Sequence, residues 1–121
     1  MDDEKPLFWL GSSLDRIRDF PDPVKDVMGY ALQIAQWGSK YLDAKPLRGF
    51  KGASVLEIID NFDGNTYRAV YTVRFKEAVY VLHVFQKKSK RGIKTPKQDL
   101  ELIRERLRVA QSHYARFLAR Q

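Results

Sequence analysis

The chain has 121 residues, no cysteine and a formal net charge of +7. This length suits a single domain over residues 1–121 that buries roughly two thirds of its surface on folding, and such a domain needs no disulfide. The lack of cysteine, the acidic first residues and the absence of any apolar run near the ~20 residues of a membrane span predict a cytoplasmic protein without a secretory signal or a membrane span.

The first part of the chain predicts one strand followed by two helices. Leu7–Leu10 is a short apolar run typical of a strand, and a short helix is predicted over residues 14–20. Asp22 followed by Pro23 is a start signal for a second helix, whose apolar residues recur at helical spacing up to Gly38. We expect the two helices to form an antiparallel pair that covers one face of a sheet.

Three strands are predicted after these helices, over residues 55–60, 67–75 and 78–86. Between the first two, Asp63-Gly64 is a strong signal for a tight hairpin. The order of strand, helix, helix, three antiparallel strands and a last helix predicts an α+β fold, with an antiparallel sheet and the helices packed on one face.

The last helix has the clearest pattern in the chain. Thr95–Gln98 is typical of a capping box with proline in the first turn. We interpret the apolar stripe that follows as a surface packed on the protein's own sheet, with docking of a partner as the alternative. The stripe consists of Leu100, Ile103, Leu107, Ala110, Tyr114 and Phe117.

Positive charge is concentrated where the apolar strand 78–86 ends. Such a strand is expected to be central in the sheet. The cations that follow it are therefore expected to lie at the edge of a rigid sheet. This arrangement favours binding of a polyanion, and phosphate backbones are the commonest polyanions that a small protein meets. Residues 86–97 contain six bases and no acid: Lys87, Lys88, Lys90, Arg91, Lys94 and Lys97.

The alternation of side chains along residues 66–75 places Tyr67 on the core face, and Arg68 and Arg74 on the opposite face. We expect that opposite face to be open, because an unpaired buried arginine is costly, and an exposed arginine offers a planar fork of donors to a phosphate. Glu57 on the neighbouring strand is predicted to lie on the same side as Arg68. A simple cross-strand ion pair is the alternative to a catalytic role.

The sequence does not decide which face of the sheet His83 occupies, because its strand is apolar on both sides. A buried core histidine and an acid–base residue are both compatible with this position. The two histidines lie far apart in the sequence and there is no cysteine, so no metal site is predicted. No P-loop or glycine-rich dinucleotide motif is present.

Several short motifs follow one another in a defined order along the chain. From about Trp9 to Tyr114, this order resembles phage-derived HigB-like toxins of the RelE/ParE superfamily, which belong to type II toxin–antitoxin systems. The motifs are Lys45-Pro46-Leu47 with Gly49, Val55-Leu56-Glu57-Ile58, Tyr67-Arg68-Ala69-Val70-Tyr71, Leu82-His83, and Phe85 with Lys87-Lys88, followed by Thr95-Pro96 and a helix.

The resemblance implies a RelE/ParE-like fold and a toxin that cleaves mRNA, commonly on the translating ribosome, without a metal or another cofactor. It also implies a cognate helix-turn-helix antitoxin of the HigA type, whereas the oligomeric state is left open. The implied chemistry is attack of a ribose 2′-hydroxyl on the adjacent phosphorus. Such a reaction needs a base, cations for the developing charge and an acid for the leaving oxygen.

The resemblance also assigns residues to these roles. Arg68 corresponds to the arginine that contacts the scissile phosphate, and Lys87 and Lys88 would add charge stabilisation. Glu57 lies on the strand that holds the general base in some relatives, and His83 is a further acid or base candidate. The other cations are assigned to RNA binding: Lys45, Arg48, Arg74, Lys90, Arg91, Lys94 and Lys97.

Two other functions remain open at this point. A ParE-like toxin would inhibit DNA gyrase and cut no RNA, and a basic module could bind RNA without any reaction. The cations at Arg68, Lys87 and Lys88 favour cleavage, because a gyrase inhibitor has no need of cations concentrated on the sheet.

Overall fold

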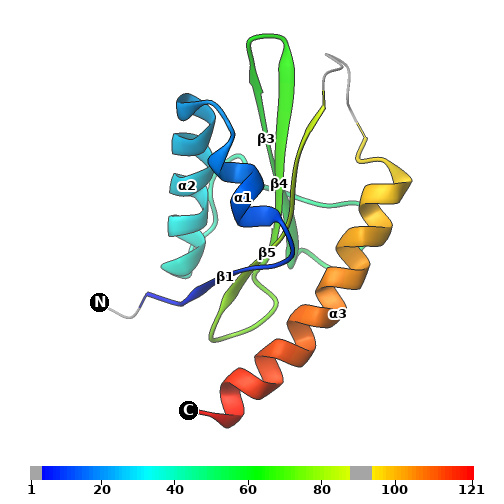
Figure 1. The fold of residues 1–121 in the computed structure, drawn as a ribbon. Coiled ribbons are helices and arrows are strands. Elements are labelled where there is room, and N and C mark those ends of the chain that lie inside the picture. The colour runs from blue at the N-terminus through cyan, green and yellow to red at the C-terminus, as the bar shows by residue number, and fades with distance from the viewer. Residues whose placement is uncertain (1–3, 88–93) are drawn as a thin grey trace.

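The computed structural model describes residues 4–87 and 94–121 (Figure 1). The strands described form one sheet in the order β1-β5-β4-β3-β2. The predicted α+β order of elements is confirmed, with β2 as an additional strand of two residues. The elements are β1 (Leu7–Trp9), α1 (Ser13–Arg18), α2 (Asp22–Gln36), β2 (Lys45–Pro46), β3 (Val55–Phe62), β4 (Asn65–Thr72), β5 (Val79–Lys87) and α3 (Lys97–Ala119).

The predicted antiparallel sheet needs one correction, at the edge strand β1. Strands β2, β3, β4 and β5 pair antiparallel with their neighbours, whereas β1 pairs parallel with β5. Parallel pairing requires a long connection between two strands, and α1, α2 and the β2–β4 strands supply it here. Strand β5 is therefore central, as predicted.

The β3–β4 hairpin follows the sequence prediction closely. Its two-residue turn consists of Asp63 and Gly64, whose φ angles are 51° and 81°. Two successive positive φ angles are typical of a type I′ turn, whose twist matches that of the flanking strands. The turn fixes the register of the hairpin, in which Phe62 pairs with Asn65 and Glu57 pairs with Val70.

The helices lie on both faces of the sheet, so the prediction that they share one face is wrong. Helices α1 and α2 pack against one face, whereas α3 crosses the other (Figure 1). The second face needs a cover because Val55, Val70 and Leu82 make it apolar as well. Ile103 and Leu107 of α3 provide that cover. The interpretation of the stripe on α3 as a surface packed on the protein's own sheet is therefore confirmed.

An irregularity in β5 decides which face His83 occupies. Val70 pairs with His83 and Tyr71 pairs with Val81, so Leu82 is an extra residue in β5. This bulge interrupts the alternation of side chains. Leu82 packs among the residues that α3 covers, and His83 also contacts α3. Without the bulge, the side chains of Leu82 and His83 would point to opposite faces of the sheet.

The start of α3 differs from the predicted capping box. Pro96 is the N-cap residue, and no side chain caps the helix. The Thr95 hydroxyl donates instead to Glu57 of β3, at 2.7 Å between Oγ1 and Oε2. Thr95 therefore connects the segment before α3 to the sheet.

Within the part of the chain described, no helix is long and apolar enough to cross a lipid bilayer.

Candidate functional site

A pocket with a volume of about 630 Å³ lies between β2, β3 and the start of α3. Its walls combine three cationic side chains, one carboxylate, one hydroxyl and several apolar side chains. Because the cations greatly outnumber the carboxylate, the pocket suits an anionic ligand better than a metal ion. The lining residues are Lys45, Pro46, Leu47, Arg48, Glu57, Ile59, Lys94, Thr95 and Leu100.

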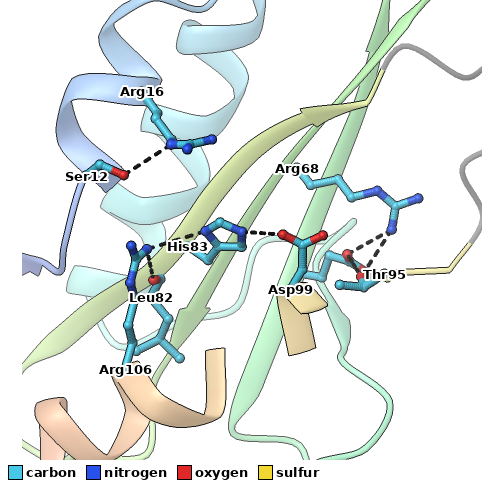
Figure 2. A network of polar contacts seen from close by, with 9 residues as sticks. Ser12, Arg16, Arg68, Leu82, His83, Thr95, Asp99 and Arg106 are labelled. Carbon is cyan, nitrogen blue, oxygen red and sulfur yellow. Dashed lines mark hydrogen bonds and ion pairs between the residues drawn. The ribbon is translucent and has the colours of Figure 1, made fainter. Parts of the chain in front are cut away.

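Arg68, Glu57 and Thr95 form a polar triangle beside this pocket. The Arg68 Nη1 donates to Glu57 Oε2 at 3.0 Å and to Thr95 Oγ1 at 3.3 Å. Figure 2 shows the guanidinium of Arg68 directed at Thr95. The prediction that Glu57 and Arg68 lie on the same side of the sheet is confirmed, and they form an ion pair.

Arg68 is fully buried, so the expectation that it stands on an open face is wrong. Its side chain is 0% exposed, and that of Glu57 is 11% exposed. The face is closed because α3 and the segment that precedes it lie over it. Burial makes the ion pair with Glu57 necessary, since an unpaired guanidinium in this position would be strongly unfavourable.

The guanidinium of Arg68 retains unused hydrogen-bonding capacity. Its Nε and Nη2 are buried and have no hydrogen-bond partner among the described residues. A buried donor without an acceptor costs on the order of 1–3 kcal/mol. The structure therefore holds a positive group with free donors next to a cationic pocket, and an incoming anion could satisfy those donors.

His83 belongs to a second polar network, one that does not line the pocket. Its Nε2 lies 2.7 Å from Asp99 Oδ1, and its Nδ1 lies 3.4 Å from Arg106 Nη1 (Figure 2). Because arginine can only donate, Nδ1 acts as the acceptor and Nε2 carries the hydrogen that is donated to Asp99. Arg106 also donates to the Leu82 carbonyl at 2.9 Å, so the network connects β5 to α3.

Burial is the main reason that the pKa of His83 lies below its ordinary value of 6.5, and repulsion from Arg106 and Arg16 lowers it further. The hydrogen bond and charge of Asp99 oppose this shift without reversing it. His83 is therefore neutral at neutral pH. Both of its ring nitrogens are engaged in the network, which suits a residue that positions α3 against the sheet.

We expect the lowered pKa of His83 to make the protein less stable below about pH 6.5. The unfolded chain takes up this proton near pH 6.5, whereas the folded protein takes it up only at a lower pH. The free energy of unfolding is thus unaffected above this window. It falls within the window by up to about 1.4 kcal/mol per pH unit.

Urea unfolding of the wild type and of His83→Gln at a series of pH values between about pH 7.5 and pH 5 measures this contribution. The difference in unfolding free energy between the two proteins should be constant above the window and should shift in favour of the variant as the pH falls. A difference that stays constant over the whole range would contradict a lowered pKa for His83.

Three of the cations assigned to RNA binding come together at the pocket. Lys45, Arg48 and Lys94 all line it, although Lys94 lies more than 40 residues from the others in the sequence. Lys87 pairs with Thr66 at the end of β5, on the same face of the sheet as Arg68. The structure therefore brings Lys45, Arg48 and Lys94 together at the pocket, whereas Lys87 shares the face of Arg68 without lining the pocket.

The other predicted site residues lie elsewhere or outside the described residues. Arg74 follows the end of β4, where its Nε donates to Ser54 Oγ at 3.4 Å, and it does not line the pocket. Lys97 is the exposed first residue of α3. The assignments of Lys88, Lys90 and Arg91 concern residues that the structure does not describe.

Sequence analysis missed several residues that form the site. The sequence predicts a helix cap that includes Thr95, and nothing in it links the Thr95 hydroxyl to Glu57 across 38 positions. Asp99 could have been suspected, because it is the one acid in the first turn of α3. Ile59 and Leu100 line the pocket through apolar side chains, for which the sequence carries no signal.

The five-stranded sheet, flanked by α1 and α2 on one face and by α3 on the other, defines a small mixed α+β protein with a cationic pocket. Residues 15–108 match the sequence family described as phage derived protein Gp49-like. The chain belongs to this phage-derived family, a family of RelE-like toxins.

Among solved structures, a mutant of the E. coli toxin RelE in the free state is similar to this chain, with 19% sequence identity and a TM-score of 0.48. The similarity covers 67% of this chain and 81% of that chain. Comparison with curated proteins gave no match.

Proposed function

We propose that the protein is the toxin of a type II toxin–antitoxin system and that it cleaves mRNA on the ribosome without a metal. The observation that best supports this proposal is the pocket itself. One carboxylate, Glu57, lies among Lys45, Arg48 and Lys94, directly beside the buried Arg68. A base surrounded by fixed positive charge is the combination that cleavage of a phosphodiester by its own 2′-hydroxyl requires.

In the proposed reaction, Glu57 takes the proton from the 2′-hydroxyl, and the 2′-oxygen forms a bond to the adjacent phosphorus. The bond from phosphorus to the 5′-oxygen then breaks, and that oxygen takes up a proton. The products are a 2′,3′-cyclic phosphate and a 5′-hydroxyl. The charge that develops on the phosphorus oxygens is stabilised by Lys94 and by the free donors of Arg68.

Lys87 is our candidate for the proton donor to the leaving oxygen, because it lies on the same face as Arg68 at the end of β5. Lys88 is proposed to add charge beside it. We assign no proton transfer to His83, because its partners are Asp99 and Arg106 and it does not line the pocket. In this proposal, His83 keeps α3 in place over the sheet.

Membership of the Gp49-like family supports the proposal that a cognate antitoxin neutralises the protein. We propose a HigB-like toxin whose antitoxin is a HigA-like helix-turn-helix protein. A protein of this kind acts in the cytoplasm, where both mRNA and the antitoxin are found.

Brief induction of the protein in bacteria, followed by mapping of new mRNA 5′ ends, tests the proposal. We expect growth arrest and new 5′ ends that keep a fixed position relative to codons, because a ribosome-bound toxin cuts in register with translation. Glu57→Gln should produce neither effect. Intact mRNA combined with reduced DNA supercoiling would contradict the proposal and would indicate a gyrase inhibitor instead.

A further inference from the structure

We propose that the pocket binds one unstacked guanine base of the RNA, and that Arg48 reads its edge. This inference rests on the proposed function, since it concerns the RNA that the toxin would cut. It follows from three features of the pocket: its size and apolar walls, the balance of donors and acceptors, and the way in which the backbone around Arg48 is held.

The size and walls of the pocket suit a nucleobase. Its volume of about 630 Å³ falls in the range of roughly 300–1,000 Å³ that is typical of small-molecule sites. Pro46, Leu47, Ile59 and Leu100 give it apolar surfaces on which a flat ring can stack. Ile59 is 42% exposed on the wall of the pocket, where a stacked base would cover it.

The polar groups of the pocket are mostly donors. Glu57 Oε2 already accepts hydrogen bonds from Arg68 and from Thr95, and the Thr95 hydroxyl hydrogen is used in that contact. The remaining polar side chains of the wall, Lys45, Arg48 and Lys94, can only donate. Because the proposed function assigns Glu57 to the 2′-hydroxyl, a ligand group that faces these three cations must present acceptors.

Guanine meets this requirement better than adenine or cytosine, and unlike uracil it has two adjacent acceptors on this edge. Its N7 and O6 are two adjacent acceptors, and a bidentate contact from arginine to this edge is the commonest base-specific contact in protein–nucleic acid complexes. Adenine has a donor amine next to N7, and cytosine presents an amine at the corresponding position. Opposite a cationic wall, these amines would be left without acceptors.

The backbone that carries Arg48 is held in place on both sides. On one side of it, the Leu47 amide donates to the Val55 carbonyl at 2.9 Å. On the other side, Arg104 of α3 donates to the Gly49 carbonyl at 3.0 Å and stacks over the Phe50 ring at 5.0 Å. The backbone of Arg48 is thus anchored on both sides, so no loop has to be ordered when its side chain binds a base.

Titration of the full-length protein with 5′-GMP, 5′-AMP, 5′-CMP and 5′-UMP, followed by two-dimensional NMR, tests this inference without any need for cleavage. We expect 5′-GMP to bind at least about tenfold more tightly than the other three nucleotides. The largest chemical-shift changes should occur at Arg48, Ile59 and Leu100. Equal affinity for all four nucleotides, or no binding of 5′-GMP in the millimolar range, would overturn the inference.

The variant Arg48→Lys separates base recognition from charge. It keeps the positive charge but loses the planar fork, so the preference for 5′-GMP should disappear while weak binding of all four nucleotides persists. Arg108→Lys is the matched control, because Arg108 is an exposed residue of α3 outside the pocket, and it should retain the full preference. If Arg48→Lys keeps the wild-type preference, Arg48 does not read the base.

Mapping of mRNA 5′ ends distinguishes failure of this inference from failure of the proposed function. If the protein prefers 5′-GMP but leaves mRNA intact, the guanine site stands and the ribonuclease proposal fails. If it cuts mRNA with no enrichment of guanine near the cut and shows no preference for 5′-GMP, the guanine site fails and the ribonuclease proposal stands.

Discussion

Replacing Arg68 by methionine is expected to lower the free energy of unfolding by about 3–5 kcal/mol, which is the usual cost of removing one partner of a buried ion pair. The side chain is 0% exposed and pairs with Glu57, whose own side chain is only 11% exposed. Methionine fills a similar volume, so the loss should arise from the unpaired carboxylate rather than from a cavity. Urea unfolding at neutral pH measures the effect.

The double variant Arg68→Met/Glu57→Leu provides the matching test. Removing both charges leaves no buried group unpaired, and replacing a whole ion pair by apolar side chains is often neutral or stabilising. The double variant should therefore regain most of the stability that Arg68→Met loses. Arg74→Met, at an exposed position, should change stability by less than about 0.5 kcal/mol. If Arg68→Met cost no more than this control, the ion pair would not be buried in solution.

The relation between Glu57 and Arg68 could be predicted from the sequence because it depends on local rules. Side chains alternate along a strand, and the Asp63-Gly64 turn fixes how β3 and β4 pair. Together, these two rules place Glu57 and Arg68 on the same face, which the structure confirms. The same kind of rule predicted that the apolar stripe of α3 packs on the sheet.

The burial of Arg68 could not be predicted in this way, because it depends on where α3 docks. The sequence shows that α3 has an apolar stripe but not which face of the sheet receives it. The stripe packs on the face that holds Val55 and Val70. The segment before α3 then brings Thr95 onto Glu57. An arginine expected on an open surface thus becomes the buried centre of a polar network.

The bulge at Leu82 is a second feature that could not be predicted from the sequence. It adds one residue to β5 and so places His83 on the face covered by α3, within reach of Asp99. No glycine or proline marks this irregularity in β5. It is visible only in the register of β5 against β4. Residues whose role depends on such a shift, as that of His83 does, are found only once the structure is known.

Glu57→Gln is expected to reduce the rate of RNA cleavage by about 10²–10⁴, the usual contribution of a general base. Glutamine can still accept a hydrogen bond from Arg68 and from Thr95, so the triangle that holds the side chain can persist. It cannot take up the proton of a 2′-hydroxyl at neutral pH. Single-turnover cleavage of mRNA on purified ribosomes, with the variant in excess, measures this step apart from binding.

Asp60→Asn is the matched control for this experiment, because Asp60 lies on the same strand but alternates to the opposite face. Asp60 is partly buried, as Glu57 is, and burial raises the pKa of the Asp60 carboxyl, so the control removes a partly buried carboxyl from the same strand. It should leave the cleavage rate nearly unchanged.

Slow cleavage by Glu57→Gln has two candidate causes, the loss of the base and a displacement of Arg68. The pH dependence of the cleavage rate distinguishes them. If Glu57 is the base, the fall in cleavage rate on the acid side of the pH–rate profile should be present in the wild type and absent from the residual activity of Glu57→Gln. If the variant is slow but keeps the same acid limb, another group supplies the base. Glu57 would then act on the reaction only through its ion pair with Arg68, as a positioning residue.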